Sequence, residues 1–189
     1  MALLTTRRVR WLIALLIAVV AVAVGAAMLL VRPDLASAQD RADARWAPLR
    51  APLAARYEAL GGVAAALHTA GAADRAVTQE LDAALARWGK LALRGAEHSD
   101  IVVETTTANE LEALARRVRV NLLGSARLAT DPALAPAIAA FDQAIPPPPA
   151  VTAYNRAVRA YEDERQGAVM RLIAGALGFD SRPQLALGP

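Results

Sequence analysis

The sequence predicts an all-α protein: an antiparallel bundle of three or four long helices that follows one N-terminal transmembrane helix. Three observations favour this fold class. Residues 11–31 form an apolar run without a charge. Beyond that run, alanine and leucine dominate, and apolar residues recur at spacings of three and four, the period of an amphipathic helix. No stretch is a convincing strand. We therefore expect helices throughout.

The apolar run, WLIALLIAVVAVAVGAAMLLV, is long enough to cross a hydrocarbon core of about 30 Å as a helix. It predicts a membrane anchor at 11–31, preceded by a short basic segment, 1–10. A juxtamembrane linker is expected at 32–40, and residues 41–189 are expected to form the bundle domain.

The flanks of the run bear on orientation and processing. Arg7, Arg8 and Arg10 precede it and four arginines follow within about 20 residues, so the count alone does not decide the orientation. The density of the upstream cluster favours a cytoplasmic N-terminus, with the C-terminal domain extracytoplasmic at the cell membrane. The triplet Ala36-Ser37-Ala38 has the small-residue spacing of a signal-peptidase site, so a secreted protein released after Ala38 is the alternative. The run is longer than the roughly 7–15 apolar residues of a signal peptide, which favours a retained anchor.

Charge and cysteine content exclude several function classes. The chain has 21 Lys and Arg against 18 Asp and Glu and a pI near 9.9. The excess lies at the anchor, because the first 38 residues hold four arginines and only Asp34 as an acid, which leaves the remainder neutral. A nucleic-acid footprint is therefore not expected, and the cluster Arg116, Arg117 and Arg119 is interpreted as a solvated helix face. With no cysteine, disulfides and thiolate chemistry are excluded.

Four helices are expected before the last one. The first covers 41–68, is kinked or broken by Pro48 and Pro52, and ends near Gly71. The second covers 73–94. The third covers 105–127, with Thr107 and Glu110 as a capping box and with Leu111, Leu114, Val118 and Leu122 inward. A short fourth helix opens at Asp131-Pro132 and ends before 146–149, four prolines expected to form a stiff turn.

The last helix, 151–177, is expected to be the central element of the bundle. Tyr154, Val158, Tyr161 and Leu172 share its apolar face, while Arg165 interrupts that face and must pair or snorkel. Gly178 is placed for a left-handed C-cap, with Phe179 folding back onto the final turn. Asn155 could fix helix register or bind a ligand.

This helix carries a family resemblance. The run YNRAVRAYEDERQGAVMRLIAGALGF resembles the C-terminal signature of LemA-family proteins, and RYEALGGVAAAL, with an upstream tryptophan, resembles that family's N-terminal part. The residues that match this structural signature are Trp46, Arg56, Tyr57, Tyr154, Asn155, Val158, Tyr161, Gly178 and Phe179. Gly61-Gly62 replaces the usual proline-asparagine, and Glu162 follows the second tyrosine in place of asparagine. The chain therefore resembles a divergent member of the LemA family.

The resemblance implies a long helical bundle on one membrane helix in the cell envelope, without a known catalytic site or cofactor. The residues agree with that implication. His68 and His98 lie in no metal-ligand or catalytic spacing, and Gly89-Lys90 lacks the upstream glycine of a phosphate-binding loop. The acids of 162–164 point in different directions on a helix. We therefore expect no catalytic, cofactor-binding or metal-binding residues.

The sequence thus predicts a non-catalytic, membrane-anchored protein that mediates protein–protein interaction or envelope organisation. Its expected partners are membrane lipid, through residues 11–31, and another envelope protein. Ala14 with Ala18 and Ala21 with Gly25 leave weak self-association through the anchor open. Besides the secreted alternative, a hydrolase with an unrecognised site would need ionisable groups that converge in a cavity.

Overall fold

The computed structural model describes residues 32–93 and 100–188, and within the N-terminal run Trp11, Leu15, Leu16, Ala18, Val19, Val22 and Gly25. Across this described part the chain is helical and has no strand, which confirms the all-α helical bundle. The chain divides into two compact units. Unit 1 comprises Met1–Asp40 and Tyr161–Ser181, and unit 2 comprises Arg41–Ala160 and Arg182–Pro189.

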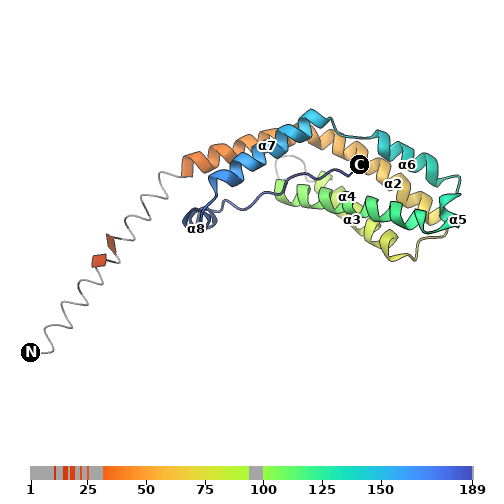
Figure 1. Cartoon of the computed structure of the whole chain (residues 1–189), viewed down its shortest axis with the longest axis horizontal. Helices are drawn as coiled ribbons and strands as arrows, with labels where there is room; N and C mark the ends of the chain where they lie inside the picture. The colour runs from red at the N-terminus through yellow and green to blue at the C-terminus, as the bar shows by residue number, and fades with distance from the viewer. Residues whose placement is uncertain are drawn as a thin grey trace, which may run out of the picture. The chain divides into compact units, whose positions relative to one another are not determined.

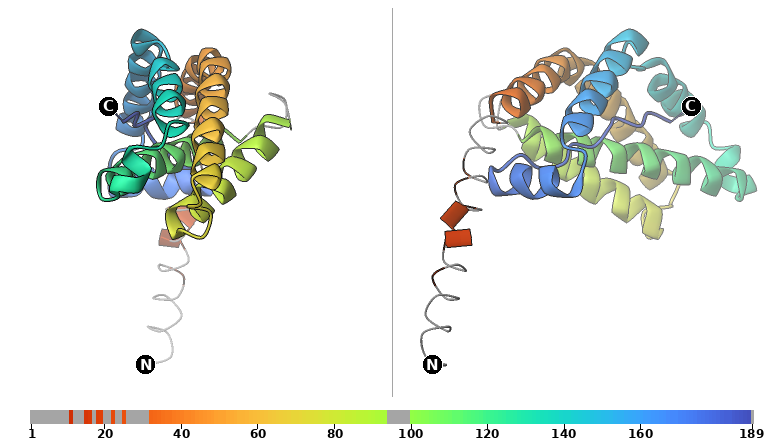
Figure 2. Two further views of the ribbon diagram at one scale, coloured as in Figure 1. Left: turned by 90° about the vertical axis from the view of Figure 1, so that its right-hand side faces the viewer. Right: turned by 60° about the vertical axis from the view of Figure 1, so that its left-hand side comes forward.

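Unit 2 is built around a long helix that packs against three others. Consecutive helices α2, α3 and α4 reverse direction along the chain, and α2 also contacts α6 (Figures 1 and 2). The elements in chain order are η1 (Ala47–Leu49), α2 (Arg50–Thr69), α3 (Ala76–Leu93), α4 (Ile101–Leu123), α5 (Ala126–Ala129), α6 (Leu134–Gln143) and α7 (Pro148–Glu164). The last four residues of α7 already belong to unit 1.

The entry into the bundle is helical. Residues 32–46, which include the expected linker at 32–40, form one continuous helix. The predicted disturbance by proline is confirmed, because a 3-10 turn at Ala47–Leu49 contains Pro48 and separates this helix from α2. Pro52 is tolerated in the first turn of α2, where its missing N–H has no intrahelical partner to lose.

The helix ends show which local signals prevailed. Gly71, at φ +67°, follows α2, and the amide of Ala72 donates to the Leu67 carbonyl, which is a Schellman cap. The predicted capping box of Thr107 and Glu110 is wrong, because α4 begins earlier. Its N-cap is Asp100, whose carboxylate accepts hydrogen bonds from the amides of Val102 and Val103 at 2.9 and 3.3 Å.

The proline run at 146–149 both separates and starts helices. Residues 144–147 are non-helical and end α6, as expected. Pro148 and Pro149, however, are the first residues of α7, where their fixed φ suits a helix and their missing amides are not needed. Asp131 accepts a hydrogen bond from the Ala133 amide at 2.9 Å, and α6 begins after that turn. The short helix α5 was not predicted.

The single helix predicted over 151–177 is wrong, because the chain breaks between α7 and α8 (Ala168–Ala176). Gly167 stands at the break with φ +100°, a conformation open to glycine and rarely to other residues. The helical period of α7 therefore does not continue into α8, and the buried face of α8 has to be found separately. Tyr154, Val158 and Tyr161 are buried as predicted, but Leu172 is 75% exposed, so its predicted inward position is wrong.

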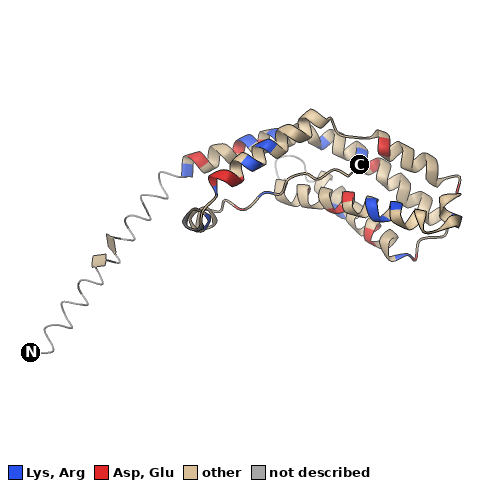
Figure 3. Cartoon of the chain, in the orientation of Figure 1, with Lys and Arg blue, Asp and Glu red and all other residues tan. Residues whose placement is uncertain are grey.

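The core of unit 2 follows the helical period. Leu53, Tyr57, Leu60, Val63 and Leu67 line one face of α2 and are buried. The four inward positions predicted for the third helix, Leu111, Leu114, Val118 and Leu122, are buried on α4. Acidic and basic side chains are interspersed over the helices that the structure describes (Figure 3), which agrees with the neutral charge of the domain.

Among the described residues, no helix combines the length and the apolar character needed to span a membrane. The predicted anchor at 11–31 and the basic segment 1–10 lie mostly or wholly outside those residues.

Candidate functional site

A buried ion pair joins α2 to α4 at the centre of unit 2. Arg56 and Glu112 are 3% and 1% exposed, and two guanidinium nitrogens donate to the two carboxylate oxygens at 2.6 and 2.9 Å. A third nitrogen of Arg56 donates to the Phe141 carbonyl at 3.1 Å, and the guanidinium lies 4.0 Å from the centre of the Phe141 ring. Such a fork satisfies both charges inside the core, which is the condition for burying them.

Tyr57 lies beside this pair. Its hydroxyl donates to the Ala108 carbonyl at 3.2 Å, and its ring meets Trp88 edge-on with centroids 4.8 Å apart. Burial, followed by the nearby negative charge of Glu112, raises the pKa of Tyr57 well above its ordinary value. The neutral phenol is therefore held as a hydrogen-bond donor, and it has no role as a base at neutral pH.

A second polar cluster surrounds Trp46. Its indole N–H donates to Glu104 of α4, and the same carboxylate accepts from Arg50 at 3.1 Å. The Trp46 ring packs on Tyr154 of α7 with centroids 5.0 Å apart. The Tyr154 hydroxyl is 3.1 Å from the hydroxyl of Thr105, and burial raises the pKa of Tyr154. The cluster links the helix at 32–46 to α4 and α7.

The C-terminal segment runs extended over unit 2 between two asparagine side chains. Asn155 accepts from the amide of Leu185 at 2.8 Å and donates to the carbonyl of the same residue at 2.9 Å. Asn109 donates to the Gln184 carbonyl and accepts from the Ala186 amide, both at 2.8 Å. In an extended chain, the backbone groups of residue 185 point to one side and the Gln184 carbonyl and Ala186 amide to the other. The two asparagine side chains therefore take the place that neighbouring strands have in a sheet.

The remaining signature residues lie in unit 1. The Tyr161 hydroxyl donates to the Asp180 carbonyl at 2.8 Å. Gly178, at φ +80°, ends α8, and the Phe179 amide donates to the Ala174 carbonyl at 2.9 Å, which confirms the predicted left-handed cap. Phe179 is buried, as expected of a residue that folds back. Arg165 pairs with Glu162 at 2.6 Å and donates to the Phe179 carbonyl at 3.1 Å, as its interruption of the apolar face predicted.

The signature residues thus take part in several structural contacts and do not converge on one cavity. Those in unit 2 are Trp46, Arg56, Tyr57, Tyr154, Asn155 and Val158, and those in unit 1 are Tyr161, Gly178 and Phe179. Sequence reasoning missed their partners on α4, Glu104, Asn109 and Glu112. A signal for two of them was present. Glu104, Ala108 and Glu112 are spaced by four, so the two acids share the buried face of α4.

An apolar groove of about 500 Å³ lies where α4, α5 and α6 meet. Its wall includes the side chain of Leu123, which is 86% exposed, and an ion pair between Arg119 and Asp142 stands among the lining residues. The apolar lining includes Leu122, Leu123, Leu128, Leu134, Ile138 and Ala139. Val120, three residues before Leu123 on the same helix, is also exposed.

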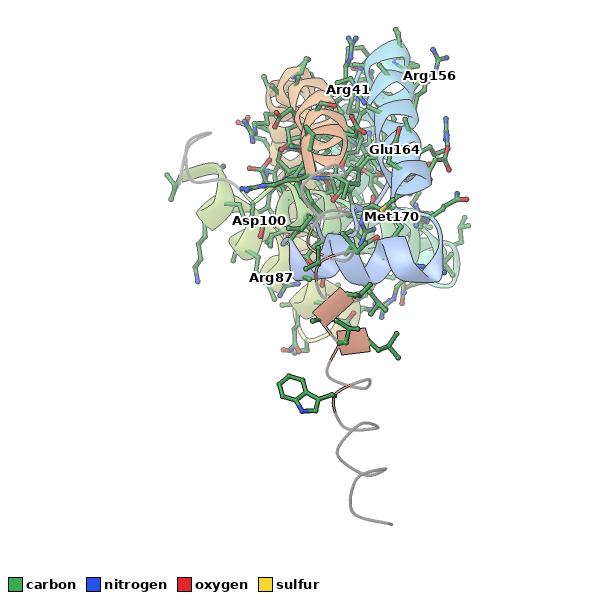
Figure 4. The ribbon with its side chains drawn as sticks, turned by 90° about the vertical axis from the view of Figure 1, so that its left-hand side faces the viewer. Arg41, Arg87, Asp100, Arg156, Glu164 and Met170 are labelled. Carbon is green, nitrogen blue, oxygen red and sulfur yellow. The ribbon has the colours of Figure 1, made fainter. Side chains whose placement is uncertain are left out.

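A second groove, of about 520 Å³, lies between the helix at 32–46 and α7 and has an alanine floor. Arg41, Arg45 and Arg156 line it, and Figure 4 shows Arg41 and Arg156 on two neighbouring helices. Arginine remains protonated at physiological pH, so these side chains could bind an anion but cannot serve as acid–base catalysts.

His68 and two arginines of the predicted cluster on α4 have side-chain partners. His68, in the last turn of α2, is 2.8 Å from Asp82 and is partly exposed, which fits the expected helix-end histidine. His98 lies outside the described residues. Within those residues no group of three potential ligands could hold a metal ion. Arg117 pairs with Glu80 on the surface, lowering the pKa of that carboxyl, and Arg119 pairs with Asp142.

Comparison of the chain with protein-family models, with curated proteins and with solved structures gives no match.

Proposed function

We propose that the chain is a membrane-anchored, non-catalytic helical-bundle protein of the cell envelope and a divergent member of the LemA family. It acts by binding another protein through the apolar groove of α4, α5 and α6. The observation that carries the proposal is this groove, because a cavity of about 500 Å³ lined by leucine, isoleucine and alanine suits the apolar face of a helix.

The anchor is supported by the apolar run and by its described side chains. Trp11, Leu15, Leu16, Val19 and Val22 are helical and exposed. Large apolar side chains gathered on one exposed segment favour lipid as their surroundings. We place the N-terminus in the cytoplasm and the bundle outside it, following the arginines that precede the run.

Secretion after Ala38 remains the second candidate, and one observation counts against it. Ala38 is helical and buried, and Leu35, which cleavage would remove, is buried in the same cluster. Cleavage after Ala38 would therefore remove two residues that the folded protein buries in its cluster. N-terminal sequencing of the mature protein distinguishes the two, because a retained anchor leaves the residues before 38 in place, whereas cleavage gives a chain that begins at Gln39.

Site-specific photo-crosslinking in intact cells tests the groove. A photoreactive amino acid at Leu123 should give a discrete adduct with one partner, because this side chain is exposed in the groove wall. Ala139→Glu puts a charge into the groove and should remove most of the adduct. Ala140→Glu is the matched control, since Ala140 is exposed on the same helix but does not line the groove.

Equal loss or equal retention of the adduct in both variants would contradict the groove as the binding surface. A chain beginning at Gln39 and targeted to the same compartment should give a weaker adduct, because confinement to one membrane raises the effective concentration of the two partners. Recovery of a small-molecule substrate or of nucleic acid bound to residues 39–189 would overturn the proposed function.

A further inference from the structure

Unit 1 has a small core of its own, which attaches α8 to the helix that leaves the apolar run. Leu35 and Ala38 from that helix are buried together with Tyr161, Ala174 and Phe179. Because Ala174 lies within α8 and Phe179 follows its C-cap, the position of α8 is fixed beside Leu35.

The place of this cluster along the chain sets its distance from the apolar run. Leu35 is four residues after Val31, the last residue of the run, and residues 32–40 are helical. At 1.5 Å per residue, Leu35 is about 6 Å beyond the end of the run along the helix axis. The headgroup layer of one leaflet is about 5–8 Å thick. A bilayer that holds residues 11–31 would therefore have its headgroups at the level of α8.

The direction of α8 also suits such a surface. Where the helix at 32–40 is seen from the side, α8 is seen nearly end-on, so the two helices of unit 1 cross (Figure 1). In Figure 4, Met170 marks α8, which runs across the view there. If the anchor stands perpendicular to the bilayer, a helix that crosses it steeply lies close to the membrane plane.

The exposed face of α8 carries one large apolar side chain and one arginine. Ile173 and Ala174 are buried, whereas Leu172 is 75% exposed and Arg171, Gly175 and Ala176 are exposed beside it. The helix holds no acidic residue. Interfacial helices place apolar side chains below the headgroups and arginine beside the lipid phosphates.

We propose that α8 lies on the lipid bilayer, with Leu172 in contact with the acyl chains and Arg171 among the headgroups. This inference rests on the proposed anchor at 11–31. One exposed leucine would bind a membrane weakly if it acted alone. Here the anchor already holds α8 at the surface, so little further affinity is needed.

Spin-label depth measurements test this contact, since the chain has no cysteine and any single Cys variant is labelled at one place. The full chain is reconstituted into phosphatidylcholine–phosphatidylglycerol vesicles with a nitroxide at Leu172→Cys. Relaxation by oxygen, which concentrates in acyl chains, is compared with relaxation by a water-soluble nickel complex. We expect oxygen accessibility to exceed nickel accessibility severalfold at residue 172.

Two labelled controls separate the possible failures. Leu123→Cys, exposed on α4 in unit 2, should show the reverse ratio, because we assign that position to water. Leu16→Cys reports the anchor. Lipid exposure at 16 with a water-exposed label at 172 would overturn the inference while the anchor stands, and so would a label at 172 shielded from both reagents, which indicates protein contact. A water-exposed label at 16 would overturn the anchor itself.

Discussion

Two arginines with the same kinds of partner hold very different parts of the molecule together. Arg56 in unit 2 and Arg165 in unit 1 each pair with a glutamate, donate to a phenylalanine carbonyl and lie over an aromatic ring. Arg56 reaches Glu112 on another helix and the carbonyl of Phe141 on a third. Arg165 pairs with Glu162, three residues before it in the chain.

The difference in reach determines what each arginine stabilises. Arg56 and Glu112 are almost fully enclosed, so the pair joins α2, α4 and α6, and loss of one partner leaves a charge in the core. Glu162 is 32% exposed, so water can replace it around Arg165. The same chemistry is therefore essential to the tertiary structure in unit 2 and serves mainly to shape a local turn in unit 1.

Removing the acid of the central pair should have the largest effect. Glu112→Ala leaves Arg56 charged and unpaired in the core, and we expect the free energy of unfolding to fall by about 3–5 kcal/mol. Urea denaturation of the full chain in detergent, followed by circular dichroism, measures this. Replacing both residues, as Arg56→Met with Glu112→Leu, should restore most of the loss. A loss below about 1 kcal/mol in the single variant would show that the pair is not a tertiary clamp.

The apolar cluster, rather than Arg165, should be the main source of stability in unit 1. Leu35→Ala removes a fully buried side chain from that cluster, and we expect a loss of about 2–3 kcal/mol, the low end for Leu→Ala because the cluster is small. Asp40→Ala, at an exposed position of the same helix, is the control that leaves the cluster unchanged. Urea denaturation that shows no difference between the two variants would mean that the cluster contributes little.

The smallest effect is expected at the local arginine pair. Glu162→Ala removes a partly exposed partner of Arg165, so a loss of about 0.5–1 kcal/mol should follow. This change should diminish further in 1 M salt, whereas the effect of Glu112→Ala should persist there, because buried charges are screened less. Equal salt sensitivity in the two variants would remove the distinction between the two arginines.

Local signals in the sequence predicted much of the fold. The spacing of leucine and alanine located the helices, and Gly178 with Phe179 predicted a cap that forms within a few residues. The failures arose where distant or weak signals compete. Asp100 replaced Thr107 as the N-cap because α4 begins nearer that aspartate. The break after α7 depends on one glycine, Gly167, inside an otherwise helical pattern.

The candidate site was less accessible to sequence reasoning. Arg56 was identified only as part of a family pattern, since its partner lies on another helix. Leu172 was placed inward because the break after α7 was missed, and the break shifts the phase of every later position. From the sequence, Asn155 could either fix helix register or bind a ligand. The structure shows that it binds backbone of the same chain, a partner that spacing along a helix cannot reveal.

The two asparagines that bind residues 184–186 also set an order of events during synthesis. Leu185, enclosed in the core of unit 2, follows α2, α3 and α4 in the chain. Those helices are therefore made before it and can associate while translation continues. The backbone site between Asn109 and Asn155 is filled only after residues 184–186 have been made. Unit 2 therefore completes its core late, and a chain that stopped before residue 184 would leave parts of α4 and α7 uncovered.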